Sequence, residues 1–101
     1  MIKERIIKQL QIKPDDYDLN LQLGMVFVKE KKYPEAKKEF KKLISINKSR
    51  YEGYLNLSNI YGILNKLDDS EKILKKFIKK NHYNKEIING LAILYYNSKN
   101  F

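Results

Sequence analysis

A spacing of 34 residues recurs along the chain and constrains its fold more than any other feature. The repeated pattern occurs three times. It consists of a bulky position, two intervening residues, a leucine followed by a small residue, two more residues and another large side chain. The three copies are Asn20, Leu23, Gly24 and Phe27; Tyr54, Leu57, Ser58 and Tyr61; and Ile88, Leu91, Ala92 and Tyr95. A fixed period in this range is typical of a solenoid, in which each unit packs against its neighbours.

Apolar residues recur at helical spacing in six segments, and no segment shows the alternation typical of a strand. We predict helices over residues 2–12, 17–30, about 33–48, 51–64, about 68–81 and 85–96, joined by short polar connections. Pro34 suits the first turn of the third helix. The predicted fold class is therefore all-α, and the strict periodicity favours an α-solenoid over a bundle.

The middle position of the repeated pattern is always small. Gly24 stands in the middle of a predicted helix, where glycine costs about 1 kcal/mol relative to alanine. Ser58 and Ala92 occupy the equivalent positions and are also small. We expect this position to let a neighbouring helix approach closely.

These residues resemble the tetratricopeptide repeat, whose pattern is W-x2-L-G-x2-Y, then A-x3-F, then P. The second helices supply Ala36-x3-Phe40 and Ser70-x3-Leu74. The resemblance divides the chain into residues 1–16 (second helix of a partial repeat), 17–50, 51–84 (two repeats) and 85–101 (first helix of a truncated repeat). It implies a right-handed solenoid of stacked antiparallel helix hairpins. Asn20, in place of the usual aromatic residue, is expected to loosen the packing locally.

The resemblance also implies that the first helix of each repeat lines a concave groove, which makes the chain a protein–protein interaction scaffold. Residues off the packing stripe of those helices mix amides, which can bond a peptide backbone, with aliphatic side chains. The predicted peptide-binding residues are Leu21, Gln22, Met25, Lys29, Leu55, Asn56, Asn59, Ile63, Asn89, Ile93 and Tyr96. Alternatively, Asn56 and Asn59 are simply common residues of such repeats.

The charged residues near this groove bear on two classes of ligand, acidic C-terminal peptides and basic ligands. Chaperone-binding members of the family clamp a C-terminal carboxylate, and the matching positions here hold Leu21, Met25, Asn56, Glu86 and Gly90. Only Asn56 agrees, and Glu86 would repel a carboxylate, so we expect no dicarboxylate-clamp chaperone ligand. The in-phase acids Asp18, Glu52 and Glu86 form either an acidic rim for basic ligands or stabilising charges in helix first turns.

The formal net charge of +9 raises nucleic acid or an anionic membrane as partners. However, the chain has 19 lysines and only 2 arginines, whereas arginine is preferred for bidentate phosphate contacts. The in-phase lysines Lys8, Lys42 and Lys76 would form a ridge on the outer helices. A solvated lysine face explains this ridge more simply, so nucleic-acid binding stays an alternative function.

Catalysis has little support in the sequence. The chain has one histidine, His82, and no cysteine, so no Ser/His/Asp or Cys/His set can form. We expect no metal, no cofactor and no enzymatic activity; the alternative is a non-catalytic N-terminal array of a larger enzyme such as a transferase. No apolar run is long enough to span a membrane, and no apolar run after Met1 resembles a signal peptide. We therefore expect the cytoplasm as location.

The phase of the last unit leads to one further expectation. Phe101 stands where a second helix would begin, so we predict that the chain is the N-terminal piece of a longer protein. Without that helix, Leu91, Leu94, Tyr95 and Phe101 would form an exposed apolar edge, through which the chain could self-associate.

Overall fold

The computed structural model describes residues 1–98, which form six α-helices and, within that range, no strand. The helices are α1 (Ile2–Ile12), α2 (Tyr17–Lys29), α3 (Tyr33–Ile46), α4 (Glu52–Ile63), α5 (Leu67–Lys80) and α6 (Lys85–Ser98). All six predicted helices are confirmed. Their ends differ from the prediction by at most two residues, as is usual at helix termini.

Two hairpin turns, 34 residues apart, are built alike. Lys31 and Asn65 adopt left-handed φ angles of 60° and 59°. In each turn the next backbone N–H reaches back five residues: Lys32 donates to the Phe27 carbonyl at 2.8 Å, and Lys66 to the Tyr61 carbonyl at 2.7 Å. These bonds satisfy carbonyl groups that the end of a helix leaves without partners. The same turn therefore reverses the chain after α2 and after α4.

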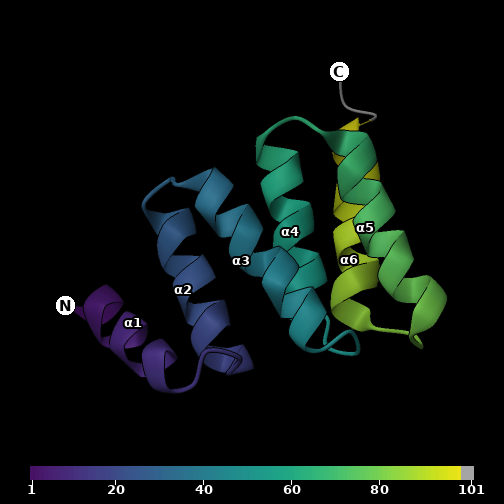
Figure 1. Ribbon diagram of the computed structural model, residues 1–101. Helices are drawn as coiled ribbons and strands as arrows, with labels where there is room; N and C mark the ends of the chain where they lie inside the picture. The colour runs from purple at the N-terminus through teal and green to yellow at the C-terminus, as the bar shows by residue number, and fades with distance from the viewer. Residues whose placement is uncertain (99–101) are drawn as a thin grey trace.

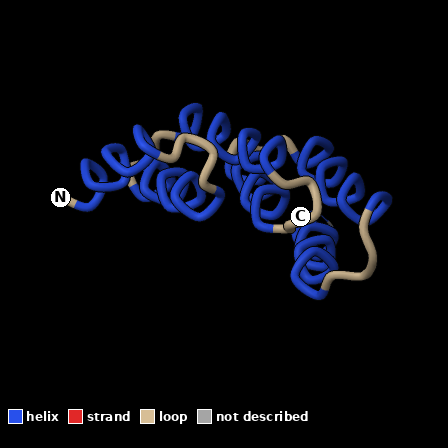
Figure 2. Tube along the Cα trace, turned by 60° about the horizontal axis from the view of Figure 1, so that its bottom comes forward, coloured by secondary structure: helices blue, strands red, loops and turns tan. Residues whose placement is uncertain are grey.

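The helices pack in chain order, each against the next, and lie in two layers (Figures 1 and 2). α1, α3 and α5 form the outer layer, and α2, α4 and α6 form the inner layer. Within the inner layer, α4 also contacts α6. The result is an elongated body of 44 × 29 × 17 Å. The predicted all-α solenoid of stacked helix hairpins is confirmed.

Two apolar clusters fill the space between the layers. The first consists of Tyr17, Ala36, Phe40, Leu43, Leu57 and Ile60. The second consists of Tyr54, Leu74, Phe77, Ile87 and Leu91. The Tyr54 and Phe77 rings meet edge to face with centroids 5.0 Å apart, a favourable aromatic geometry. Ile44 and Ile73 pack against both clusters, so the core runs continuously through the stack.

The small middle position admits a partner from the outer layer, as predicted. A Cβ atom on Gly24 would lie 2.5 Å from Cε1 of Phe40, so the glycine makes room for that ring. In the next hairpin, Ser58 replaces the glycine and the smaller Leu74 replaces the phenylalanine. Ser58 there meets Ser70 of α5, with 2.6 Å between the two hydroxyl oxygens. Each hairpin therefore balances a larger side chain on one helix with a smaller one on the other.

Asn20 does not loosen the packing, and this expectation was wrong. Its side chain is fully buried, and its amide nitrogen donates to the Pro14 carbonyl at 3.0 Å and the Asp16 carbonyl at 2.7 Å. The Asp16 carboxylate in turn accepts from the Leu19 N–H at 2.9 Å and caps α2. Asn20 therefore holds the turn between α1 and α2, a role that an aromatic residue could not fill.

The predicted apolar edge on α6 is only partly present. Tyr95 and Ile88 are exposed, and Leu94 is half buried. Leu91 is buried in the second cluster, so the prediction was wrong for this residue. Phe101 lies outside the described residues.

Candidate functional site

The predicted binding residues are distributed over the three inner helices. α2 carries Leu21, Gln22, Met25 and Lys29; α4 carries Leu55, Asn56, Asn59 and Ile63; α6 carries Asn89, Ile93 and Tyr96. Most are exposed, and two aliphatic side chains are unusually so: Ile63 is 52% exposed and Ile93 is 61% exposed. Large apolar side chains on one exposed face are a common mark of a binding surface.

Two adjoining hollows between α4 and α6 bring several of these residues together. The larger, of about 540 Å³, is lined by Ser58, Asn59, Gly62, Ile63, Asn65, Leu67, Ser70, Gly90, Ile93, Leu94 and Asn97. The smaller, of about 310 Å³, is lined by Leu55, Asn59, Glu86, Asn89, Gly90 and Ile93. Because Asn59, Gly90 and Ile93 line both hollows, we treat the two as one groove, called the α4–α6 groove.

Gly90 determines how close α6 lies to its neighbours. A Cβ atom at this position would lie 3.1 Å from a methyl carbon of Leu55 and 3.4 Å from one of Leu74. The glycine therefore lets α6 pack tightly against α4 and leaves the middle of the groove without a side chain from α6.

The remaining predicted residues lie outside the two hollows. Leu21 is half buried against the first core cluster, so much of its side chain contributes to packing. The Asn56 side chain donates to the Glu52 carbonyl of its own helix at 2.9 Å, which engages one of its two N–H groups. Gln22, Met25 and Lys29 are exposed on α2, and Tyr96 is exposed on α6.

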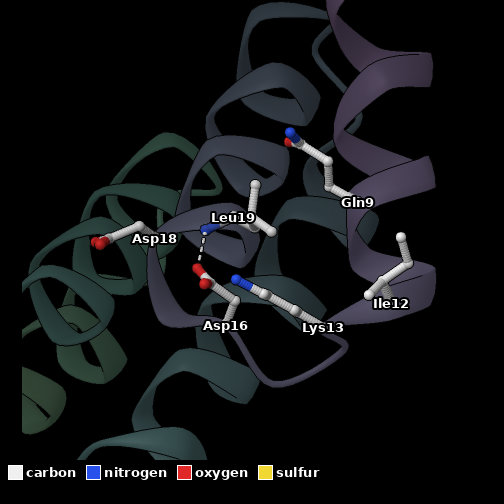
Figure 3. Close-up of a pocket in the computed structure, with 6 residues that line it drawn as sticks. All are labelled: Gln9, Ile12, Lys13, Asp16, Asp18 and Leu19. Carbon is white, nitrogen blue, oxygen red and sulfur yellow. Dashed lines mark hydrogen bonds between the residues drawn. The ribbon is translucent and has the colours of Figure 1, made fainter.

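A third hollow, which the sequence analysis missed, lies between α1 and α2. It measures about 360 Å³ and is lined by Gln9, Ile12, Lys13, Asp16, Asp18 and Leu19. Figure 3 shows the Asp16 carboxylate bonded to the Leu19 N–H, while Asp18 points away from the other five side chains. Asp16 here thus serves the start of α2, and the apolar lining is limited to Ile12 and Leu19.

The three in-phase acids have different surroundings. The Arg50 guanidinium lies 3.3 Å from Asp18 and 3.0 Å from Glu52, so both carboxylates share its single positive charge. Desolvation opposes ionisation of Glu52, yet the hydrogen bond from Arg50 keeps the pKa of that carboxyl below its usual range. Glu86 is exposed, borders the smaller hollow and has no ion-pair partner within residues 1–98. Of the three acids of the predicted rim, Glu86 is thus the one without an ion-pair partner in the described part of the chain.

The lysine ridge is interrupted by a structural contact. The Lys42 ammonium donates to the Pro14 carbonyl at 2.9 Å and so ties α3 to the turn before α2. Lys8 and Lys76 are exposed on the outer layer.

Among residues 1–98, no three His, Cys, Asp or Glu side chains are grouped closely enough to hold a metal ion. His82 is exposed in the connection between α5 and α6. No helix in the described part of the chain is long and apolar enough to cross a membrane.

Comparison with known proteins agrees with this architecture. A family profile described as tetratricopeptide repeat matches residues 17–50 and 51–79. No curated protein sequence matches the chain.

Two solved structures share the fold. One is the NMR structure of the second TPR domain of human RPAP3 in complex with the HSP70 peptide SGPTIEEVD; it has a TM-score of 0.76 and 18% identity, over 91% of this chain and 77% of that one. The other is the first TPR of Spaghetti (RPAP3) bound to the HSP90 peptide SRMEEVD, with a TM-score of 0.78 and 18% identity, over 96% and 77% of the two chains.

Proposed function

Since the chain belongs to the tetratricopeptide repeat family, we propose that it is a protein-interaction scaffold that binds an extended peptide in the α4–α6 groove. The observation that carries this proposal is the groove itself, with exposed Ile63 and Ile93 beside the amides of Asn59 and Asn89. Aliphatic side chains can accept the side chains of a peptide, and amides can bond its backbone. The helices that form the groove are held by the core, so little ordering entropy opposes binding.

A non-catalytic role fits the same surface. The described groove contains no histidine, and its one carboxylate, Glu86, has no second acid or base beside it in the smaller hollow. Activation of a nucleophile needs an adjacent base of this kind. The chemistry available is recognition by shape, hydrogen bonds and one charge.

The two similar structures hold peptides that end in an acidic EEVD sequence. We propose that this chain does not bind that class. The positions that match the carboxylate clamp carry no lysine or arginine, and Glu86 at one of them is an exposed anion.

Selection from a library of random linear peptides on the purified chain tests the proposed function. We expect selected peptides, remade synthetically, to bind the wild-type chain and to lose at least about tenfold in affinity for Ile93→Ser, since burial of an aliphatic side chain contributes about 1.5–3 kcal/mol. Ile93 is exposed, so the variant should fold normally.

Ile2→Ser is the matched control, because Ile2 is 68% exposed on α1, away from the groove. Peptides that bind wild type and Ile93→Ser equally well, or a selection that yields no binder to the folded chain, would contradict the proposal.

A further inference from the structure

We infer that the α4–α6 groove prefers peptides in which a lysine or arginine lies close in sequence to an aliphatic residue, with the cation facing Glu86. This inference rests on the proposed function and specifies its ligand. Its basis is the charge of the groove, which differs from the charge of the chain as a whole.

The positive charge of the protein is concentrated on the outer layer. The outer helices α3 and α5 carry nine lysines, whereas the inner helices α2, α4 and α6 together carry two lysines and three acids. The inner lysines, Lys29 and Lys85, line neither hollow of the groove. A bound peptide therefore meets a nearly neutral surface, on which a single uncompensated charge decides the preference.

Glu86 is that charge. Asp18 and Glu52, the equivalent acids on the other inner helices, share the guanidinium of Arg50. Arg50 has no counterpart one unit later, because Asn84 precedes α6 at the equivalent position and its side chain accepts from the Ile87 N–H at 3.0 Å. Glu86 thus remains available to a ligand, beside the Leu55 and Ile93 side chains of the smaller hollow.

The length of the groove limits the ligand. Glu86 and Asn97, both on α6, border opposite hollows, and they are separated by eleven residues or about 16 Å of helix. An extended chain rises about 3.3 Å per residue, so the groove accommodates about five residues. Glu86 and Ile93 lie about 10 Å apart along α6, so the cation and the aliphatic contact would fall within about three residues of each other in such a peptide.

The test uses three short, end-blocked, fluorescently labelled peptides with a central Ile-Leu pair flanked on both sides by lysine, serine or glutamate. Fluorescence anisotropy at low salt should show the lysine peptide binding about threefold tighter than the serine peptide and about tenfold tighter than the glutamate peptide. Added salt should reduce these ratios, because it screens an exposed ion pair.

Glu86→Gln should abolish the preference for lysine over serine. Glu35→Gln removes the same charge from the exposed surface of α3 in the outer layer, and it should leave the preference intact. This control separates the local effect of Glu86 from the net charge of the chain.

Equal affinity for all three peptides, or tightest binding of the glutamate peptide, overturns the inference and leaves the proposed function standing. The same holds if none of the three binds while library-selected peptides do. If the selected peptides also ignore Ile93→Ser, the proposed function itself fails.

Discussion

The phenol oxygen of Tyr17, at the start of α2, accepts a hydrogen bond from the backbone N–H of Gly53, at the start of α4, at 3.2 Å. Gly53 is the second residue of its helix, so its N–H has no acceptor within α4. Tyr51, at the N-cap, provides no side-chain hydrogen bond. The first residue of one hairpin therefore caps the first helix of the next.

Tyr17→Phe should lower the free energy of unfolding by about 1–2 kcal/mol, because it leaves the buried Gly53 N–H without a partner. Urea denaturation followed by circular dichroism measures the change. Tyr83→Phe is the control, since Tyr83 is exposed. Equal stability of the two variants would show that water replaces the phenol at no cost.

Alkaline pH should destabilise the fold through the buried phenol of Tyr17. Burial raises the pKa of Tyr17 to about 12 from its ordinary value of 10.0. The unfolded chain thus releases this proton at lower pH than the folded chain, and stability falls as the pH rises from about 10 to about 12. Denaturation at several pH values in this window should give a steeper loss for wild type than for Tyr17→Phe; parallel curves would contradict the assignment.

The contact between Gly24 and Phe40 predicts that substitutions at these two positions have coupled effects on stability. Gly24→Ser should destabilise the chain by about 1–3 kcal/mol, because the added atoms overlap a buried ring. Phe40→Leu in addition should restore part of the loss, since it reproduces the Ser58 and Leu74 pairing of the next hairpin.

Gly62→Ser serves as its control. Nothing lies within 4 Å of a Cβ atom at that position, so we expect a small gain in stability from helix propensity. Additive effects of Gly24→Ser and Phe40→Leu would show that the two positions do not share space.

The hydroxyl groups of Ser58 on α4 and Ser70 on α5 predict that losing the Ser70 hydroxyl alone costs more stability than losing both. Ser70 donates to the Ser58 carbonyl at 3.0 Å, so the Ser58 hydroxyl must donate to Ser70. Ser70→Ala should cost about 1–2 kcal/mol, because it leaves the buried Ser58 hydroxyl without an acceptor. The double variant Ser58→Ala, Ser70→Ala should be more stable than Ser70→Ala alone. This prediction would be refuted if the double variant lost as much unfolding free energy as the two single variants together.

The HSP90 peptide SRMEEVD should not bind this chain measurably under conditions in which library-selected peptides do. Its acidic C-terminus would meet Glu86 where a clamp needs cations. Isothermal titration calorimetry against the first TPR of Spaghetti (RPAP3), which holds this peptide, provides the positive control. Comparable affinity for both proteins would contradict the exclusion.

The helices and their pairing could be predicted because the period is carried by core residues. Leu23, Leu57 and Leu91 are all buried, and the small residues Gly24 and Ser58 face the next helix as expected, whereas Ala92 is exposed. The positions of Leu55, Asn59, Ile63, Asn89 and Ile93 on the groove side could be predicted for the same reason, because the residues outside the packing stripe form the opposite face of each helix.

Contacts between distant polar groups could not be predicted in this way. Asn20 departs from the usual aromatic, and only the position of the Pro14 and Asp16 carbonyls explains it. Tyr17 lies outside the repeated pattern, and Tyr51 at the equivalent position makes no such bond to the next helix. The pairing of Arg50 with two of the three acids depends in the same way on how the hairpins are offset, which the period does not specify.

The identical turns at Lys31 and Asn65 bear on how such a protein can change its length. A segment excised or duplicated between these two points would begin and end in the same backbone conformation. The chain could then gain or lose a whole hairpin without a new junction. Between α1 and α2 and between α3 and α4, the lysines Lys3 and Lys37 lie over the Phe27 and Tyr61 rings, again 34 residues apart. A duplicated hairpin would find that contact already in place, so recombination within the gene could extend the ligand-binding surface in discrete steps.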